Sequence, residues 1–269
     1  ILGTWQSTLV NFSYIPGAWK KNIVEERLLG VSLTGIFDNP LTYTNDAALP
    51  GLLTGLKQRA IHTNKLWANK LGINESVSIT CVKPSGTVSQ LVECASGIHP
   101  RHSEYYIRTI RMAKMDPMSK LMIHLGFPHE DDMTATSTTL VFSFPQKSPG
   151  AAVTKDKLTP IDHMELWQTY QAHFCEHKPS VTISVPEDAW LEVGNWVFKH
   201  YEQISGISFL PESIHIYQQA PYQKCSKEEY ETLLASLPTK VDWLALKEFE
   251  DNTSGSQELA CAAGTCELT

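Results

Sequence analysis

The stretch Glu75-Ser-Val-Ser-Ile-Thr-Cys-Val82, followed at once by Lys83-Pro-Ser-Gly-Thr87, decides the fold class of this chain. Residues 75–82 alternate polar and β-branched side chains, which is the pattern of a strand. Pro84 and Gly86 then mark a turn, and the residues from Val88 to Cys94 have the composition of a helix start. A strand that passes through a tight turn into a helix is a unit from which α/β proteins are built.

Other segments extend this alternation along the chain. Hydrophobic periodicity predicts helices over residues 1–29 (in two pieces), 45–71, 162–175 and 186–203. It predicts strands over residues 28–36, 105–111, 138–144, 180–185 and 206–210. We therefore expect an α/β architecture with a largely parallel sheet, packed over residues 1–238 and followed by an acidic, flexible tail over residues 239–269.

Length and composition narrow the class of protein. The chain has 269 residues, of which 42% are hydrophobic and 19% are charged, as in a soluble globular protein with a sizeable core. It contains no apolar run near the roughly 20 residues that span a bilayer, and no signal segment opens it. Six cysteines are too few for a disulfide scaffold, so we expect a reducing, cytoplasmic location and no membrane partner. Because the first residue is Ile1, we expect the sequence to begin partway through a longer protein.

Charge is unevenly distributed. Residues 226–269 hold nine acids and three bases out of a net charge of −7, and such an acidic end argues against nucleic-acid binding. Residues 99–114 instead hold six basic or histidine side chains against the single acid Glu104. This basic stretch suits a small polyanion, and a solvated basic surface is the alternative.

The junction at residues 83–87 has the features of a phosphate site. The first amides of a helix have no partner within the helix, and its dipole is positive at that end, so a phosphate is favoured there. Gly86 would let the phosphate approach the backbone, while Ser85 and Thr87 add hydroxyl donors. The alternative is an ordinary Pro-Ser-Gly turn with a threonine cap.

The last residues, Cys261-Ala-Ala-Gly-Thr-Cys266-Glu-Leu-Thr269, carry a second chemical signal. Two cysteines on a polar arm close too small a loop to stabilise a fold, but they can move electrons between places. Half of a zinc site is the alternative. His173 and His177 have a helical ligand spacing, but we interpret them as a solvated pair and predict no metal.

Several matching segments occur in order from end to end of the chain. They are Ile1-Leu-Gly-Thr-Trp-Gln6, Lys83-Pro-Ser-Gly-Thr-Val-Ser-Gln-Leu91, Ala95-Ser-Gly-Ile-His-Pro-Arg101, residues 25–36, 105–108, 141–145, 179–183 and 206–211, and the terminal C-x-x-x-x-C. In this order they resemble the C-terminal portion of an adenosylcobalamin-dependent (class II) ribonucleotide reductase.

That resemblance implies a fold and a set of roles. The fold would be the C-terminal part of a ten-stranded α/β barrel, in which a finger loop carries the cysteine that becomes a thiyl radical. The substrate phosphate would bind the loop of Pro84, Ser85, Gly86, Thr87 and Val88. Cys261 and Cys266 would re-reduce the active-site disulfide and would themselves be reduced by thioredoxin.

The resemblance also implies what this chain lacks. The radical cysteine, its partner carboxylate and the reducing cysteine pair would all precede Ile1, as would most contacts to adenosylcobalamin. We therefore expect the chain alone to be inactive and to need the N-terminal part of the enzyme. The short C-x-x-x-x-C ending favours a reductase of ribonucleoside triphosphates, which makes deoxyribonucleotides for DNA synthesis.

Three alternatives stay open on the sequence. The same type of enzyme could act on ribonucleoside diphosphates. A different class would be a noncatalytic phosphate-binding module whose terminal cysteines bind metal or serve regulation. A free-standing thiol oxidoreductase is the weakest, because a C-x-x-C beside a βαβ unit is absent.

Overall fold

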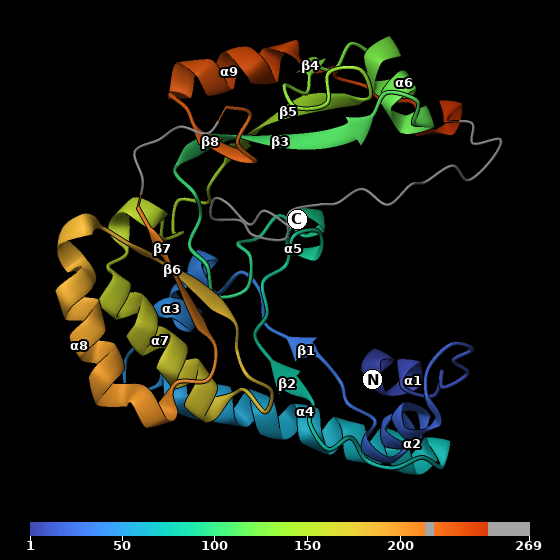
Figure 1. The fold of residues 1–269 in the computed structure, drawn as a ribbon, viewed down its shortest axis with the longest axis vertical. Coiled ribbons are helices and arrows are strands. Elements are labelled where there is room, and N and C mark those ends of the chain that lie inside the picture. Colours follow the sequence, from blue (N-terminus) through green and yellow to red (C-terminus); the bar gives the residue numbers. More distant parts are fainter. Residues whose placement is uncertain (213–217, 247–269) are drawn as a thin grey trace. The chain divides into compact units, whose positions relative to one another are not determined.

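The computed structural model describes residues 1–212 and 218–246, and these form two compact units (Figure 1). Unit 1 consists of residues 1–100 and 158–212. Unit 2 consists of residues 101–157 together with the described residues that follow 212. The predicted boundary between residues 238 and 239 stays a prediction, because residues 247–269 lie outside the described part of the chain.

Unit 1 combines helices with two pairs of parallel strands. Its helices are α1 (Leu2–Gln6), α2 (Gly17–Glu26), α3 (Pro40–Tyr43), α4 (Leu49–Leu71), α5 (Val88–Leu91), α7 (Pro160–His173) and α8 (Trp190–His200), with short 3-10 turns η1 (Ile36–Asp38), η3 (Glu187–Ala189) and η4 (Tyr201–Gln203). Strand β1 (Val31–Ser32) pairs with β2 (Thr80–Cys81), and β6 (Val181–Val185) pairs with β7 (Ile207–Pro211).

The core of unit 1 forms around α7. This helix begins where the Thr159 side chain accepts a hydrogen bond from the amide of Asp162, with a proline at its first position. The apolar face predicted for residues 162–175 is confirmed, because all of its five members are buried: Met164, Leu166, Trp167, Tyr170 and Phe174. Helix α7 packs against α4 on one side and β6 on the other, so it connects the first and the second stretch of unit 1.

Unit 2 is built on an antiparallel sheet. Its strands are β3 (Tyr105–Ala113), β4 (His129–Asp131), β5 (Thr139–Lys147) and β8 (Tyr222–Lys224), in the order β4-β5-β3-β8. Helices α6 (Pro117–His124) and α9 (Lys227–Ser236) cover one face of it (Figure 1), and the unit also contains the 3-10 turns η2 (Lys155–Lys157) and η5 (Trp243–Ala245). Met122, Phe127, Leu140 and Phe142 form the core beneath them.

The predicted mixture of helices and strands is confirmed, whereas the largely parallel sheet is wrong for the largest sheet, whose pairs are all antiparallel. The strands over residues 105–111 and 138–144 were identified correctly, but a strand pattern carries no information on the direction of its partner. In the described residues no sheet closes into a barrel. No described helix combines the length and the apolar character that crossing a bilayer requires.

The strand predicted over residues 28–36 is much shorter in the structure, for a local reason. Gly35 adopts φ +72°, a left-handed conformation, and the chain then enters the 3-10 turn η1. Pairing is therefore confined to Val31 and Ser32. The bend at Gly35 brings the following residues against the segment 94–97, where the candidate site is found.

Candidate functional site

The predicted phosphate loop connects β2 to α5. Strand β2 ends at Cys81 and α5 begins at Val88, so Pro84, Ser85, Gly86 and Thr87 form the turn between a buried strand and a helix, as the sequence predicted. Helix α5 has only four residues. A single helical turn contributes little macrodipole, so what the loop offers a ligand is its individual donors.

Ser85 fixes the shape of this loop. Its amide donates to Oγ of Ser96 at 2.7 Å, and its own Oγ accepts the amide of Ser89 at 2.9 Å. The Ser89 hydroxyl donates to the carbonyl oxygen of Ser85 at 2.6 Å, and this side chain is fully buried. Thr87 is the N-cap residue of α5 and makes no side-chain capping bond, but the Ser85 hydroxyl accepts an amide of the first turn and the Ser85 amide links the loop to the segment that follows the helix.

The backbone of Gly97 packs directly against the start of the loop at Lys83. It adopts φ +55°, and a Cβ at this position would lie 2.6 Å from the carbonyl oxygen of Lys83. The two backbones therefore approach more closely than any side chain would permit. The Gly97 amide donates to Oγ1 of Thr34 at 3.0 Å, which ties this contact to the residues around the Gly35 bend.

Thr34 and Asp38 complete the support. The Thr34 hydroxyl donates to the carbonyl oxygen of Ala95 at 2.9 Å, and the carboxylate of Asp38 accepts the Ala95 amide at 2.7 Å. The Cys94 thiol lies 3.6 Å from Oγ1 of Thr34. Three segments distant in sequence, around residues 34–38, 83–89 and 94–97, thus form one hydrogen-bonded assembly, and no role was predicted for its supporting residues.

The outer side of the loop carries donors without acceptors. Neither the amide nor the hydroxyl of Thr87 makes a hydrogen bond to any described residue, and the same holds for the amide of Val88. Thr87 and Val88 are exposed. Two consecutive amides and one hydroxyl are thereby available to an anionic ligand.

Two histidines near the loop are structural. The His99 ring accepts the amide of Thr182 at Nε2 (3.0 Å) and therefore donates from Nδ1 to the carbonyl oxygen of Ser96 (3.0 Å). His163 donates from Nε2 to the carbonyl oxygen of Ile98 at 2.7 Å. Burial lowers the pKa of both rings, to about 3 for His163, so both are neutral and hold the segment 96–98 in place.

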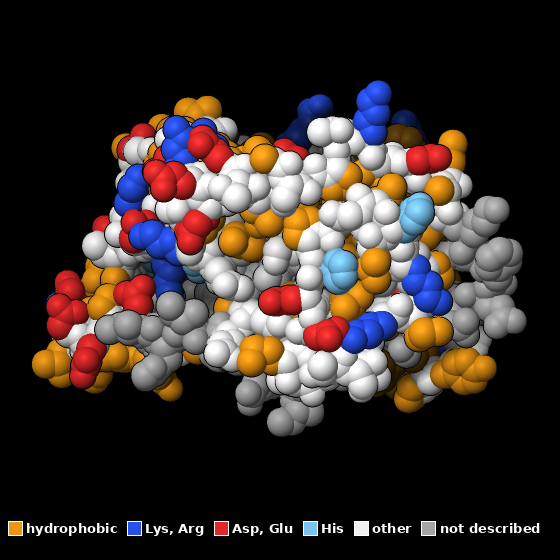
Figure 2. Space-filling model, turned by 90° about the horizontal axis from the view of Figure 1, so that it is seen from above, with side chains coloured by type: hydrophobic (Ala, Val, Ile, Leu, Met, Phe, Trp, Pro, Cys, Tyr) orange, Lys and Arg blue, Asp and Glu red, His pale blue; other side chains and the backbone are white. Residues whose placement is uncertain are grey.

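The basic stretch over residues 99–114 does not form one cationic cluster. His99 is a neutral residue of unit 1, while Arg111 pairs with Asp132 at 2.6 Å and Lys114 pairs with Asp131 at 2.5 Å within unit 2. Lys83, beside the loop, is engaged with the carbonyl oxygen of Lys178 at 2.6 Å. On the face that Figure 2 shows, acidic and basic side chains likewise lie close together rather than in separate regions.

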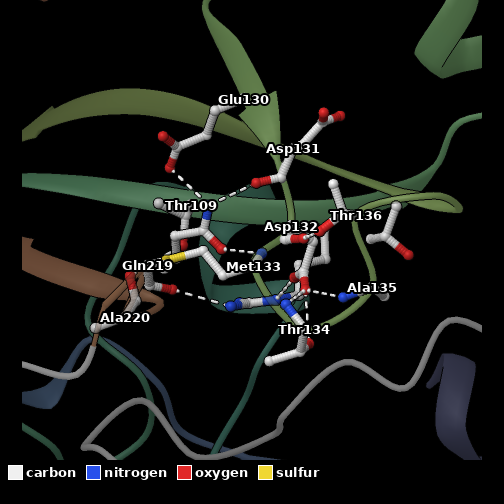
Figure 3. Close-up of polar contacts among 12 residues, drawn as sticks. Thr109, Glu130, Asp131, Asp132, Met133, Thr134, Ala135, Thr136, Gln219 and Ala220 are labelled. Atoms are coloured by element: carbon white, nitrogen blue, oxygen red, sulfur yellow. Dashed lines mark hydrogen bonds and ion pairs between the residues drawn. The ribbon is translucent and has the colours of Figure 1, made fainter.

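Figure 3 shows a polar network of unit 2 that is centred on Asp132. The Asp132 carboxylate accepts the amides of Thr134 and Ala135, the Thr134 hydroxyl, and Nε of Arg111. Burial raises the pKa of Asp132, but these hydrogen bonds outweigh burial and lower it to about 2. Gln219, at φ +56°, donates to Glu130 and accepts the amide of Met133. Because the polar atoms of Asp132 and Gln219 already have hydrogen-bond partners within the fold, we interpret this network as structural.

The described cysteines have core positions or partners within the fold. Cys81 is buried, as predicted, and burial raises the pKa of its thiol. Burial also raises the pKa of Cys175, to about 12. His177, which the sequence paired with His173, donates from Nε2 to the carbonyl oxygen of Leu29 at 2.7 Å. Cys261 and Cys266 lie outside the described residues.

The fold resembles part of a solved ribonucleotide reductase structure. A crystal structure of a B12-dependent (class II) ribonucleotide reductase superimposes on 88% of this chain with a TM-score of 0.77, at 22% sequence identity, and the match covers 37% of that protein. No family model matches the chain.

Comparison with known sequences identifies the type of reductase that this chain is similar to. The adenosylcobalamin-dependent ribonucleoside-triphosphate reductase of Euglena gracilis is 26% identical over 94% of this chain, and that of Lactobacillus acidophilus is 24% identical over 99%. A probable enzyme of the same name from Dictyostelium discoideum is 29% identical over 81%. The chain spans only 29–40% of the length of these relatives. The likenesses confirm the predicted resemblance to adenosylcobalamin-dependent ribonucleotide reductases, which are oxidoreductases.

Proposed function

We propose that this chain is the C-terminal part of an adenosylcobalamin-dependent ribonucleoside-triphosphate reductase. The observation that carries the proposal is the likeness to such enzymes over 81–99% of the chain, in sequence order and with the same fold. The complete protein would contain a ten-stranded barrel to which unit 1 contributes its parallel strands. It would replace the ribose 2′-hydroxyl by hydrogen, and adenosylcobalamin, when bound, would supply the radical chemistry.

We assign no described residue to the cofactor. The groove along α9, with a volume of about 630 Å³, is lined by Ile107 and Leu233 together with Ser226, Glu228, Glu229, Thr232 and Ser236. Seven side chains along one short helix and its neighbouring strand do not define a corrin site. The contacts to the cofactor are expected mostly outside this chain, so the chain's own contribution is to hold the substrate and deliver electrons.

In this proposal the loop of residues 84–88 binds the phosphates of the ribonucleotide. The amides of Thr87 and Val88 and the Thr87 hydroxyl would donate to phosphate oxygens, and Gly86 would leave room for them. Ser85 is occupied in shaping the loop, so its effect on binding would be indirect. Holding the phosphates fixes the ribose relative to the reacting cysteines of the missing part.

Thr87→Val tests the loop directly. The side chains are nearly the same size, and the lost hydroxyl has no partner in the described chain, so stability should be unchanged. Affinity for a ribonucleoside triphosphate, measured by equilibrium dialysis, should fall about threefold to tenfold, as expected for one hydrogen bond to a charged group. Binding of the unphosphorylated nucleoside should not change.

Gly86→Val gives the stronger test. Gly86 is not in the left-handed region, so a valine there obstructs the ligand without straining the backbone. We expect loss of nucleotide binding with an unchanged circular dichroism spectrum. Unchanged affinity in this variant would mean that the loop does not hold phosphate. A comparison of di- and triphosphates with the wild-type chain separates the two substrate classes.

The tail pair would act as the electron shuttle. A thiolate of Cys261 or Cys266 would attack the active-site disulfide and form a mixed disulfide. The second tail thiol would then attack this mixed disulfide, which releases the active-site cysteines as thiols and leaves the tail pair as a disulfide. Thioredoxin would then reduce the tail. Cys261→Ser should abolish thioredoxin-driven turnover in the assembled reductase but spare one turnover of prereduced enzyme. Equal loss in both assays would contradict the shuttle.

The alternative of another class, a noncatalytic phosphate-binding module, makes a different prediction. Its terminal cysteines would bind a metal or serve regulation. Stoichiometric zinc on the purified protein that is lost on Cys266→Ser would favour it over the reductase.

A further inference from the structure

Strand β2 ends where the candidate phosphate loop begins, and a second segment runs beside it up to that point. The carbonyl oxygen of Thr80 accepts the amide of His177 at 3.1 Å, and the carbonyl oxygen of Val82 accepts the amide of Ser180 at 3.0 Å. Acceptors and donors advance in the same direction along the chain, so the two segments are parallel. In a parallel ladder the next bond of this series would be made two residues further on.

That next bond is not made by the strand. Two residues further on are Pro84 on one side and Thr182, in β6, on the other. The Thr182 amide, however, donates to Nε2 of His99 at 3.0 Å. A ring nitrogen therefore occupies the position from which the Pro84 carbonyl oxygen would continue the ladder. With that position filled, the chain turns away from β6 at Pro84 and forms the loop.

The ring of His99 also connects this position to the loop itself. Because Nε2 accepts a hydrogen bond, Nδ1 carries the proton, and it donates to the carbonyl oxygen of Ser96 at 3.0 Å. The hydroxyl of Ser96 in turn accepts the amide of Ser85 at 2.7 Å. His99 is only 7% exposed, so both of its hydrogen bonds are made inside unit 1.

Two further contacts keep the segment 95–99 in this place. His163 donates from Nε2 to the carbonyl oxygen of Ile98 at 2.7 Å, and its ring lies edge-on to that of His99, with the centroids 6.2 Å apart. A Cβ on Gly97 would lie 3.5 Å from the backbone nitrogen of Pro84, so the segment passes directly beside the end of β2. The segment 95–99 is buried throughout.

We propose that His99 is a positioning residue for the substrate phosphates. By taking the place of a strand carbonyl opposite Thr182, it determines where β2 ends and keeps residues 84–88 turned out of the ladder as a loop. Without the ring, the Thr182 amide would lose its acceptor, and pairing with the Pro84 carbonyl would recover that loss. Such pairing would extend β2 into the loop and change the turn that presents its free amides.

This inference rests on the phosphate-binding role proposed above for residues 84–88. Two substitutions separate the hydrogen bonds of the ring. His99→Gln places a carboxamide oxygen near the position of Nε2, so it can still accept the Thr182 amide but loses the bond to Ser96. His99→Asn places a carboxamide NH2 near the position of Nδ1, so it keeps the bond to Ser96 and loses the one to Thr182.

Nucleotide affinity should distinguish the two variants in the assembled reductase. His99→Asn should weaken the binding of a ribonucleoside triphosphate about tenfold in equilibrium dialysis, and His99→Gln by less than about twofold. Binding of the unphosphorylated nucleoside should change in neither. Each variant loses one buried hydrogen bond, so their urea midpoints should fall by similar amounts. A role in stability alone would change the two affinities together. His62→Asn, at an exposed position of α4, is the matched control and should alter neither measurement.

The tautomer of His99 tests the geometry without any substitution. NMR of the reductase with ring nitrogen-15 in its histidines should show His99 as a neutral ring that is protonated at Nδ1. A ring protonated at Nε2 would mean that this atom does not accept the Thr182 amide, and it would overturn the proposal.

The binding data can also overturn the proposal. Equal loss of affinity in the two His99 variants would do so, as would unchanged affinity in both while Thr87→Val weakens binding. If Thr87→Val and Gly86→Val also leave triphosphate affinity unchanged, the loop itself does not hold phosphate, and the role of His99 falls with it. The loop variants therefore distinguish failure of the positioning role from failure of the phosphate site.

Discussion

Replacing Gly97 by alanine should destabilise unit 1 more than its change in backbone preference alone can explain. At φ +55° an L-residue costs about 1–2 kcal/mol. The new Cβ would also lie 2.6 Å from a backbone oxygen of Lys83, which cannot rotate away as a side-chain end could. Displacing that strand end adds about 1–3 kcal/mol, so we expect a total loss of about 2–5 kcal/mol.

Gly72→Ala is the matched control. Gly72 ends α4 at φ +65°, but a Cβ there meets nothing within 4 Å. It should therefore cost only the backbone part, about 1–2 kcal/mol. The difference between the two variants isolates the contact between Gly97 and Lys83.

Urea unfolding followed by tryptophan fluorescence suits this comparison. Of the seven tryptophans, all except Trp243 belong to unit 1, so the signal reports mainly on the unit that carries both glycines. The midpoint should fall further for Gly97→Ala than for Gly72→Ala, and nucleotide binding should weaken only in the former. Equal losses in the two variants would refute the idea that Gly97 holds the loop in place.

Three further perturbations have defined outcomes. Burial lowers the pKa of His163 to about 3, so near pH 6.5 only the unfolded chain takes up a proton on this ring. The free energy of unfolding should therefore fall as the pH drops from about 6.5 towards 3, by up to about 1.4 kcal/mol per pH unit. His163→Gln should reduce this pH dependence, whereas the same substitution at the exposed His62 should leave it unchanged. Asn64→Ala should lower the free energy of unfolding in urea by about 2–3 kcal/mol, since the buried side-chain amide of Asn64 bonds the hydroxyls of Thr4 and Ser76 and the backbone amide of Ser76. The same substitution at the exposed Asn69 should change stability by less than about 0.5 kcal/mol. Asp132→Asn removes the negative charge that accepts four hydrogen bonds, so the thermal midpoint of unit 2 should fall, with a loss of about 2 kcal/mol in stability. A midpoint equal to that of the wild type would contradict the structural role of Asp132.

The sequence predicted local structure where the signal is local. The alternation over residues 105–111 and 138–144 identified both long strands, and the apolar spacing from Met164 to Phe174 identified a buried helix face. The direction of strand pairing was not accessible, because it depends on connections rather than on the strands themselves. The strand expected up to Ile36 stopped early because Gly35 adopts a conformation that composition alone does not specify.

The same contrast holds at the candidate site. The loop of residues 84–88 was located correctly between strand and helix, because proline and glycine mark turns. The residues that hold the loop in place were not predicted, since Thr34 is 63 residues from Gly97 in sequence and no short motif contains both. Gly97 could have been suspected from its place in Ala-Ser-Gly-Ile-His-Pro, but the partner that makes a glycine necessary is visible only in three dimensions.

Unit 1 consists of two separate stretches of the chain, so its parts become available at different times during synthesis. The Glu176 carboxylate accepts the amides of Ile79 and Thr80, which precede it by 97 and 96 residues. At roughly 5–20 residues per second, these two amides would wait about 5–20 seconds on the ribosome before Glu176 is synthesised. During that interval the amides of Ile79 and Thr80 lack the partner that they have in the folded protein. A pause in translation before residue 176, or a protein cut at residue 157, would therefore leave the loop of residues 84–88 attached to a strand that lacks its Glu176 contact.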